Sequence, residues 1–208
     1  MPKKLKNELL LATNNAGKLK ELHQLLTELS GVRLLAPNDL GLWLDVAESG
    51  ESYAENAALK AAAFSQAADL VVIADDSGLE VDALGGAPGI RSARYAPQPG
   101  ATDADRRALL LENLSGQPRP WTARFRAWVA IAAPGEVIRS VEGICEGEII
   151  PEERGTNGFG YDPIFWIPSA GRTMAELTDE EKNALSHRGN AVRQAIPLLR
   201  KIFNRQGS

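Results

Sequence analysis

Hydrophobic positions in the first third of the chain form short continuous runs that alternate with helical spacing. Leucines at 19, 22, 26 and 29 recur every three or four residues, as the buried face of an amphipathic helix requires. An Ala-rich stretch without Gly or Pro follows at 52–68 and predicts a second helix. The predicted order is a strand at 9–13, the helix at 19–29, a strand at 32–36, the helix at 52–68 and a strand at 70–74. This alternation is typical of an α/β fold.

The pattern changes in the second half of the chain. After a helix at 103–113, two long segments at 122–133 and 137–150 flank Pro134-Gly135 and predict a pair of antiparallel strands. The sheet is therefore expected to be mixed. Thr178, with Glu181 three residues on, predicts a capping box for a short helix. Pro197 is expected to kink or shorten the last helix, which begins after Ser186.

Composition limits the class of protein and its partners. A chain of 208 residues with 44% hydrophobic residues predicts one globular domain, or two lobes sharing a core, over residues 1–208. The net charge is −4, so the chain would gain little electrostatic binding energy from nucleic acid or anionic membranes. Neither is expected as a partner.

The cysteine count and the N-terminal segment predict a cytoplasmic protein. Cys145 has no second cysteine to pair with, which fits a reducing compartment. Lys3, Lys4 and Lys6 precede an apolar run that is too short for a secretory signal, and no stretch is long enough for a membrane span.

A candidate anion site lies where the first strand turns into the first helix. In the segment 13–18, backbone N–H groups at the helix start and the charge of Lys18 favour a phosphate. The segment is not a Walker loop, because Ala12 and Leu19 replace the required Gly and Ser/Thr. The alternative interpretation is helix capping by Asn with a solvated lysine.

Carboxylates that could hold a metal follow the most apolar predicted strand. Asp75, Asp76 and Ser77 end that strand, and the side chains of neighbouring strand residues point to opposite faces, so the two Asp residues should serve different purposes. With Glu48 they would supply the oxygen ligands that Mg²⁺ prefers. The alternative is that Asp-Ser-Gly only forms a turn.

Two further segments could recognise a nucleobase. The glycine-rich loop 155–162 contains Phe159, which could stack on a base, and Asp162, which could accept a base N–H. A tight turn with buried aromatic residues is the alternative. His187 and Arg188 begin a helix, where positive charge opposes the macrodipole, so a functional reason for them is favoured over simple exposure.

Taken in order, these segments resemble the inosine-triphosphate pyrophosphatase family over nearly the whole chain. The matching segments are TNNAGK (13–18), SYAENAALKA (52–61), ADDSGL (74–79), GGAPGIRSARY (85–95), GTNGFGYDPIF (155–165) and ELTDEEKNALSHRG (176–189). The resemblance implies a mixed, curved α/β sheet flanked by helices, with two lobes around a substrate cleft, usually in a homodimer. It also implies Mg²⁺-dependent hydrolysis of ITP, dITP, XTP and dXTP to the nucleoside monophosphate and pyrophosphate, which cleanses the nucleotide pool.

The resemblance further implies a role for each matching residue. Asp76 would activate water, and Glu48 and Asp76 would hold Mg²⁺, with Glu51 as the alternative to Glu48. Substrate would be bound by Thr13, Asn14, Asn15, Ala16, Gly17, Lys18, Ser77, Phe159, Gly160, Tyr161, Asp162, Lys182, His187 and Arg188. The last four positions of the loop, with His187 and Arg188, would enclose the purine, and Lys182 would neutralise phosphate charge.

Two other functions stay open from the sequence. One is a related housekeeping pyrophosphatase acting on pyrimidine nucleotides, against which the Phe159 loop and the Ser186–Gly189 segment argue. The other is a nucleotide-binding module without catalysis. The carboxylates at 48, 75 and 76 argue against it, because a pure binder gains little from acids beside phosphates.

Overall fold

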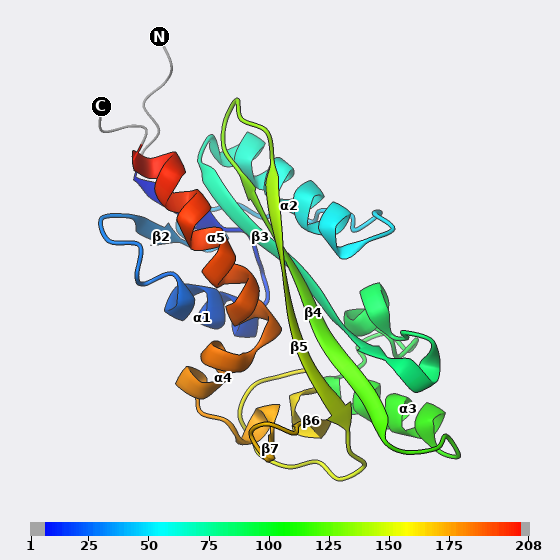
Figure 1. Ribbon diagram of the computed structural model, residues 1–208. Helices are drawn as coiled ribbons and strands as arrows, with labels where there is room; N and C mark the ends of the chain where they lie inside the picture. Colours follow the sequence, from blue (N-terminus) through cyan, green and yellow to red (C-terminus); the bar gives the residue numbers. More distant parts are fainter. Residues whose placement is uncertain (1–6, 205–208) are drawn as a thin grey trace. The chain divides into compact units, whose positions relative to one another are not determined.

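A computed structural model describes residues 7–204, so the predictions for Lys3, Lys4 and Lys6 lie outside the described residues. Figure 1 shows the course of the chain. The strands are β1 (Glu8–Leu11), β2 (Arg33–Leu35), β3 (Val71–Val81), β4 (Trp121–Ala132), β5 (Arg139–Ile149), β6 (Phe165–Ile167) and β7 (Arg172–Thr173). The α-helices are α1 (Ala16–Leu25), α2 (Tyr53–Ala68), α3 (Asp103–Leu114), α4 (Asp179–Leu185) and α5 (His187–Asn204).

The strands form one seven-stranded sheet in the order β2-β1-β3-β4-β5-β6-β7. β1 pairs in parallel with both β2 and β3, and Leu10 lies beside Leu35 on one side and Val72 on the other. At the other end of the order, β6 pairs antiparallel with β5 and with β7. The prediction of a mixed α/β sheet flanked by helices is therefore confirmed.

The chain divides into two compact units. Among the described residues, the first unit consists of 7–76, 127–143 and 188–204, and the second of 77–126 and 144–187. One boundary falls directly after Asp76, inside β3. The single domain expected from the sequence stays a prediction.

In the first unit, both faces of the strands are covered by apolar side chains. Leu9 and Leu11 of β1 and Val71 and Ile73 of β3 pack in one cluster with residues of α1 and α5. The residues between them, such as Leu10, pack in a second cluster with Ala-rich α2. This alternation follows from the two-residue period of a strand, and it explains why β1 and the first half of β3 are continuously hydrophobic.

The second unit has its own core. Leu110 and Leu114 of α3 are fully buried against the far half of β3 and residues of β4 to β6. Met174 and Leu177, which lie in the segment between β7 and α4, close the same cluster. The helix α4 begins with the predicted capping box, in which Thr178 Oγ1 accepts a hydrogen bond from the Glu181 N–H at 3.2 Å.

Two elements depart from the sequence prediction. β3 does not end at Asp75–Gly78 but continues to Val81, because its polar side chains find partners without breaking the strand. α5 continues through Pro197 to Asn204, so the helix is not shortened, and the alternative of a kink stays a prediction. Its residues Ile196, Leu199 and Ile202 are buried in the first unit's cluster, and this burial offsets the cost of an interior proline, which is typically about 3 kcal/mol. Within residues 7–204 no helix is both long and apolar enough to cross a membrane.

The loop 155–162 begins at a glycine that no other residue can replace easily. Gly155 has a φ of +80°, and a Cβ there would lie 2.3 Å from the backbone carbonyl of Ala175. Gly171 has a similar φ of +62°, but a Cβ there would meet nothing within 4 Å. Substitution of Gly171 therefore tests backbone strain alone, whereas substitution of Gly155 tests strain together with a steric clash.

We predict that Gly155→Ala destabilises the second unit by more than about 3 kcal/mol, because strain and a backbone clash add together. Gly171→Ala should cost only about 1 kcal/mol, from strain alone. Urea unfolding of both variants measures the difference. Equal losses would show that the contact with Ala175 does not constrain the loop.

Candidate active site

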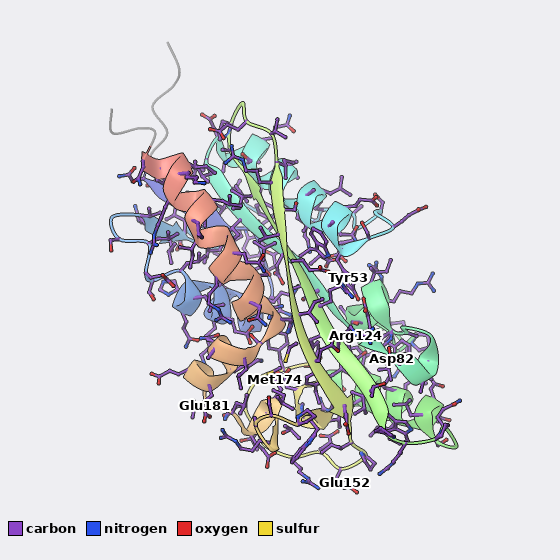
Figure 2. The ribbon with its side chains drawn as sticks, viewed as in Figure 1. Tyr53, Asp82, Arg124, Glu152, Met174 and Glu181 are labelled. Atoms are coloured by element: carbon purple, nitrogen blue, oxygen red, sulfur yellow. The ribbon has the colours of Figure 1, made fainter. Side chains whose placement is uncertain are left out.

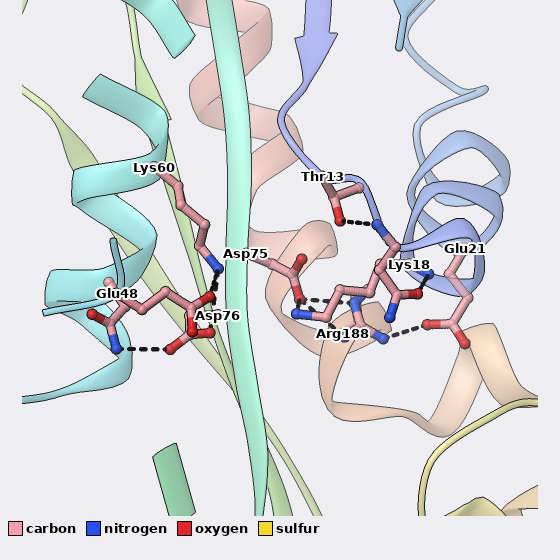
Figure 3. Close-up of polar contacts among 10 residues, drawn as sticks. Thr13, Lys18, Glu21, Glu48, Lys60, Asp75, Asp76 and Arg188 are labelled. Atoms are coloured by element: carbon pink, nitrogen blue, oxygen red, sulfur yellow. Dashed lines mark hydrogen bonds and ion pairs between the residues drawn. The ribbon is translucent and has the colours of Figure 1, made fainter. Parts of the chain in front are cut away.

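Asp75 and Asp76 lie in the middle of β3 and point to opposite faces of the sheet (Figure 3). The side chain of Asp75 faces residues of α1 and α5, and that of Asp76 faces residues of α2. The prediction that the two acids serve different purposes is supported by this division. The interpretation as a simple turn is wrong, because both residues are in the strand.

Asp75 is the centre of a buried ion-pair network. Its Oδ2 lies 2.9 Å from Arg188 Nη2 and 3.1 Å from Lys18 Nζ, and Arg188 also donates to Glu21. Burial alone would raise the pKa of Asp75, but the charges of Lys18 and Arg188 outweigh it and hold the pKa well below its usual range. Asp75 is therefore a permanently ionised anchor that orders two cations.

Asp76 belongs to a second, less buried cluster. Its Oδ2 accepts a hydrogen bond from Asn56 Nδ2 and its Oδ1 one from Lys60 Nζ, both at 3.3 Å. Lys60 also lies 3.1 Å from Glu48 Oε1, so one ammonium group joins the two carboxylates. Burial raises the pKa of Asp76, with a further contribution from Glu48, although Lys60 opposes the shift. A carboxylate with a raised pKa is a better proton acceptor than an ordinary surface Asp.

At the helix start at 13–18, the structure confirms the Asn cap of one interpretation but not its solvated lysine, and the anion site of the other stays a prediction. Asn15 caps α1 by accepting a hydrogen bond from the Lys18 N–H at 3.0 Å, and its own N–H donates to Thr13 Oγ1. Lys18 is not solvated, because its ammonium lies against Asp75 and its side chain is 17% exposed. Burial lowers the pKa of Lys18, and the charge of Asp75 opposes this effect.

In the second unit, the glycine-rich loop is closed on itself. Asp162 Oδ2 accepts hydrogen bonds from the Phe159 N–H, at 2.8 Å, and from Lys182 Nζ. The Lys182 ammonium also lies 4.8 Å from the centre of the Phe159 ring, a cation–π distance. Tyr161 is buried, and its hydroxyl donates to the Ser92 carbonyl. Tyr161 therefore belongs to the core, whereas Phe159 stays half-buried in the loop.

His187 and Arg188 are both buried, but their partners differ. The His187 ring stacks on Phe125 with a centroid distance of 4.7 Å and an angle of 13°. Arg188 is held by carboxylates of β3 and α1, which compensate a cation at the start of a helix. Their predicted contacts with the purine, like the contact of Ser77 in β3, stay predictions.

The structure brings together two groups of the predicted residues. In the first unit, Lys18 and Arg188 meet at Asp75, and Glu48 and Asp76 meet at Lys60. In the second unit, Lys182 joins Phe159 and Asp162.

The sequence interpretation missed three residues of these networks: Glu21, Asn56 and Lys60. A signal for two of them was available. Asn56 and Lys60 are four apart and therefore share one face of the Ala-rich helix, so polar residues on that face should have a polar partner.

Comparison with known proteins places this fold and site in a family. The model of the Ham1 family matches residues 9–198, and the chain belongs to the Ham1 family. It is 50% identical over 201 residues to the dITP/XTP pyrophosphatase of Geobacillus kaustophilus, covering 96% of this chain and 98% of that protein. It is 46% identical over 200 residues to the dITP/XTP pyrophosphatase of Desulforamulus reducens, with the same coverage. The structure of a HAM1 protein from Coxiella burnetii matches with a TM-score of 0.83 and 41% identity, over 93% of this chain and 98% of that one.

We predict that Arg188→Met destabilises the protein by about 3–5 kcal/mol, because it removes a buried guanidinium that Glu21 and Asp75 share and leaves Lys18 alone to compensate Asp75. Arg200→Met is the matched control. Arg200 pairs with Glu28 at 3.2 Å, but both side chains are more than half exposed, so the loss should be at most about 1 kcal/mol. Chemical denaturation measures both. Similar losses in the two variants would contradict the role of the Asp75 network.

Proposed function

We propose that this protein hydrolyses deaminated purine nucleoside triphosphates, such as dITP and XTP, to the nucleoside monophosphate and pyrophosphate. The observation that carries the proposal is the pair of carboxylates, Glu48 and Asp76, which meet at one cation position. A helix start that suits phosphate, with its Lys18 paired to Asp75, lies on the other face of β3 (Figure 3). Relatives that share 44–50% of their residues over nearly the full length are named dITP/XTP pyrophosphatase, which supports the choice of substrate.

Mg²⁺ is the cofactor that the carboxylates fit. Glu48 Oε1 and Asp76 Oδ1 lie 3.1 and 3.3 Å from the Lys60 ammonium, so their oxygens face a common cation position, from which Mg²⁺ would displace the ammonium. Residues 7–204 contain no cluster of three or more His, Cys, Asp or Glu side chains suited to a metal. Two carboxylates completed by water and substrate phosphates are the usual Mg²⁺ arrangement. When bound, the ion would neutralise phosphate charge and make water more acidic.

The residues of this chain then divide the remaining work. Asp76 takes the proton of the attacking water, for which its carboxylate beside the proposed metal position is suited. The N–H groups of residues 13–18 and the Lys18 ammonium bind phosphate oxygens, and Lys182 adds positive charge. Ser77, next to Asp76, contacts the substrate. Asp75 stays outside the reaction and fixes Lys18 and Arg188.

Base selection belongs to the loop 155–162 and to the residues that follow α4. Phe159 offers a ring for stacking, and Gly160 and Asp162 with His187 and Arg188 enclose the base, while Tyr161 anchors this loop in the core. Donors such as Arg188 suit the 6-keto group of hypoxanthine or xanthine. Adenine would leave these donors unpaired, and a buried unpaired donor costs about 1–3 kcal/mol.

We further propose a homodimer in the cytoplasm. Exposed apolar residues of the first unit, Leu40, Trp43, Leu59 and Val137, would gain from a second copy of the chain. The single cysteine suits a reducing compartment.

We predict rapid pyrophosphate release from dITP and XTP in the presence of Mg²⁺, and little from dATP, dGTP or dUTP. The assay measures each substrate with and without Mg²⁺. A preference for dUTP would move the protein to the pyrimidine-directed class, and no release from any substrate would leave a nucleotide binder.

We predict that Asp76→Asn lowers kcat by about 10²–10⁴-fold while nucleotide binding survives, because the amide keeps the size of the side chain and loses its basicity. Asp69→Asn is the control. Asp69 ends α2 with a φ of 54°, which Asn adopts readily, so activity should be unchanged. Full activity of Asp76→Asn in a steady-state assay would refute the assignment of the base.

A further inference from the structure

The loop proposed to read the base is held at its centre by helix α3, which contributes no residue to the proposed base site. The Gly160 N–H donates to Asp103 Oδ2 at 2.7 Å, and the Gly160 carbonyl accepts from Arg107 Nη1 at 2.8 Å. The N–H and the carbonyl of Gly160 are thus both hydrogen-bonded by side chains of α3. These two side chains are four residues apart and lie on one face of the helix. A backbone residue held at donor and acceptor has little freedom to shift or rotate.

The two side chains that bond Gly160 are themselves held by ion pairs. Arg107 makes a two-pronged ion pair with Glu153, with Nε–Oε1 and Nη2–Oε2 distances of 2.8 and 2.9 Å. Asp103 pairs with Arg106, one helical turn on. Burial would raise the pKa of Asp103, but its bonds with Arg106 and with the Gly160 N–H outweigh this effect and keep the carboxylate ionised. Charge-assisted hydrogen bonds of this kind are about twice as strong as neutral ones.

Hydrogen bonds rather than packing determine where Gly160 lies. A Cβ at Gly160 would meet nothing within 4 Å, whereas one at Gly158 would lie 2.1 Å from Asp162 Oδ2. There is therefore open space beside Gly160 and none beside Gly158. The two bonds from α3 hold the Gly160 backbone at this open point, while the buried Tyr161 side chain and the bond from the Asp162 N–H to the Phe159 carbonyl hold its neighbours.

We propose that Asp103 and Arg107 are positioning residues for base selectivity, which they set by holding Gly160 and thereby the angle of the Phe159 ring relative to Asp162. The inference rests on the proposed function of the loop. Neither side chain needs to touch the substrate. Loss of either bond should let the Gly160 peptide shift and the adjacent Phe159 ring tilt, so that the site rejects purines with other hydrogen-bonding groups less strongly.

The experiment compares Asp103→Ala, Asp103→Asn and Arg107→Met with wild type. Asn keeps an oxygen that can accept from the Gly160 N–H, so it should rescue what Ala loses. Arg124→Met is the matched control. Arg124 pairs with Asp82 at 2.7 Å in the same unit, and the two side chains lie close together in Figure 2. Arg124 has no recorded contact with the loop, so its loss should leave selectivity unchanged.

For each protein we measure kcat and KM for dITP and dGTP, the melting temperature, and the amide resonance of Gly160. We expect Asp103→Ala and Arg107→Met to raise KM for dITP about tenfold with a smaller change in kcat, and to reduce the preference for dITP over dGTP by a similar factor. The Gly160 amide should shift upfield in Asp103→Ala and return in Asp103→Asn.

The outcomes separate the two proposals. A wild-type protein that releases no pyrophosphate from dITP overturns the proposed function and the selectivity role with it. If the wild type is active and the variants keep its preference for dITP over dGTP, only this inference is overturned. The same conclusion follows if the variants melt at a lower temperature but keep that preference. If Asp103→Ala does not fold, Arg107→Met carries the same test.

Discussion

Two neighbouring carboxylates in the middle of a buried strand set the main physical constraint on this protein. An ionised group inside a sheet is tolerated only when a cation or hydrogen-bond donor compensates it. Because strand side chains alternate, Asp75 and Asp76 need such partners on opposite faces. The helices on both faces provide them, with Lys18 and Arg188 on one face and Lys60 on the other. α1, α2 and α5 pack on the strands through apolar side chains, and the same helices carry the partners that the two acids need.

The charge of Asp75 is compensated more completely than that of Asp76. This difference suits Asp75 to a structural role and Asp76 to the proposed chemical one. Asp75 is fully surrounded and has its pKa held low, so it cannot exchange protons near neutral pH. Asp76 shares a single ammonium with Glu48 and keeps a raised pKa. A more completely neutralised Asp76 would be more stable but less basic. The protein thus keeps one acid rigid and leaves its neighbour less fully compensated.

Local patterns in the sequence predicted most of the fold. The helices α2 and α3 and the capping box at Thr178 could be predicted because Ala content, apolar spacing and cap residues act within a few positions. The continuation of β3 past Asp76 could not, because it depends on Lys60 and Arg188, which are distant in sequence. The same holds for the grip of α3 on the glycine-rich loop, whose partners are more than fifty residues apart.

Because the two acids are neighbours in β3, the register of this strand determines which of them faces which set of cations. A strand shifted by one residue exchanges its faces completely. Deletion of a single residue in β3 before Asp75 would place Asp76 opposite Lys18 and Arg188, and Ser77 opposite Lys60. The salt-bridge network would keep a carboxylate at its centre, while the position of the proposed proton acceptor would hold a hydroxyl. Asp75 would at the same time replace Ala74, which is fully buried among apolar side chains, so the slip would cost both stability and the proposed chemistry.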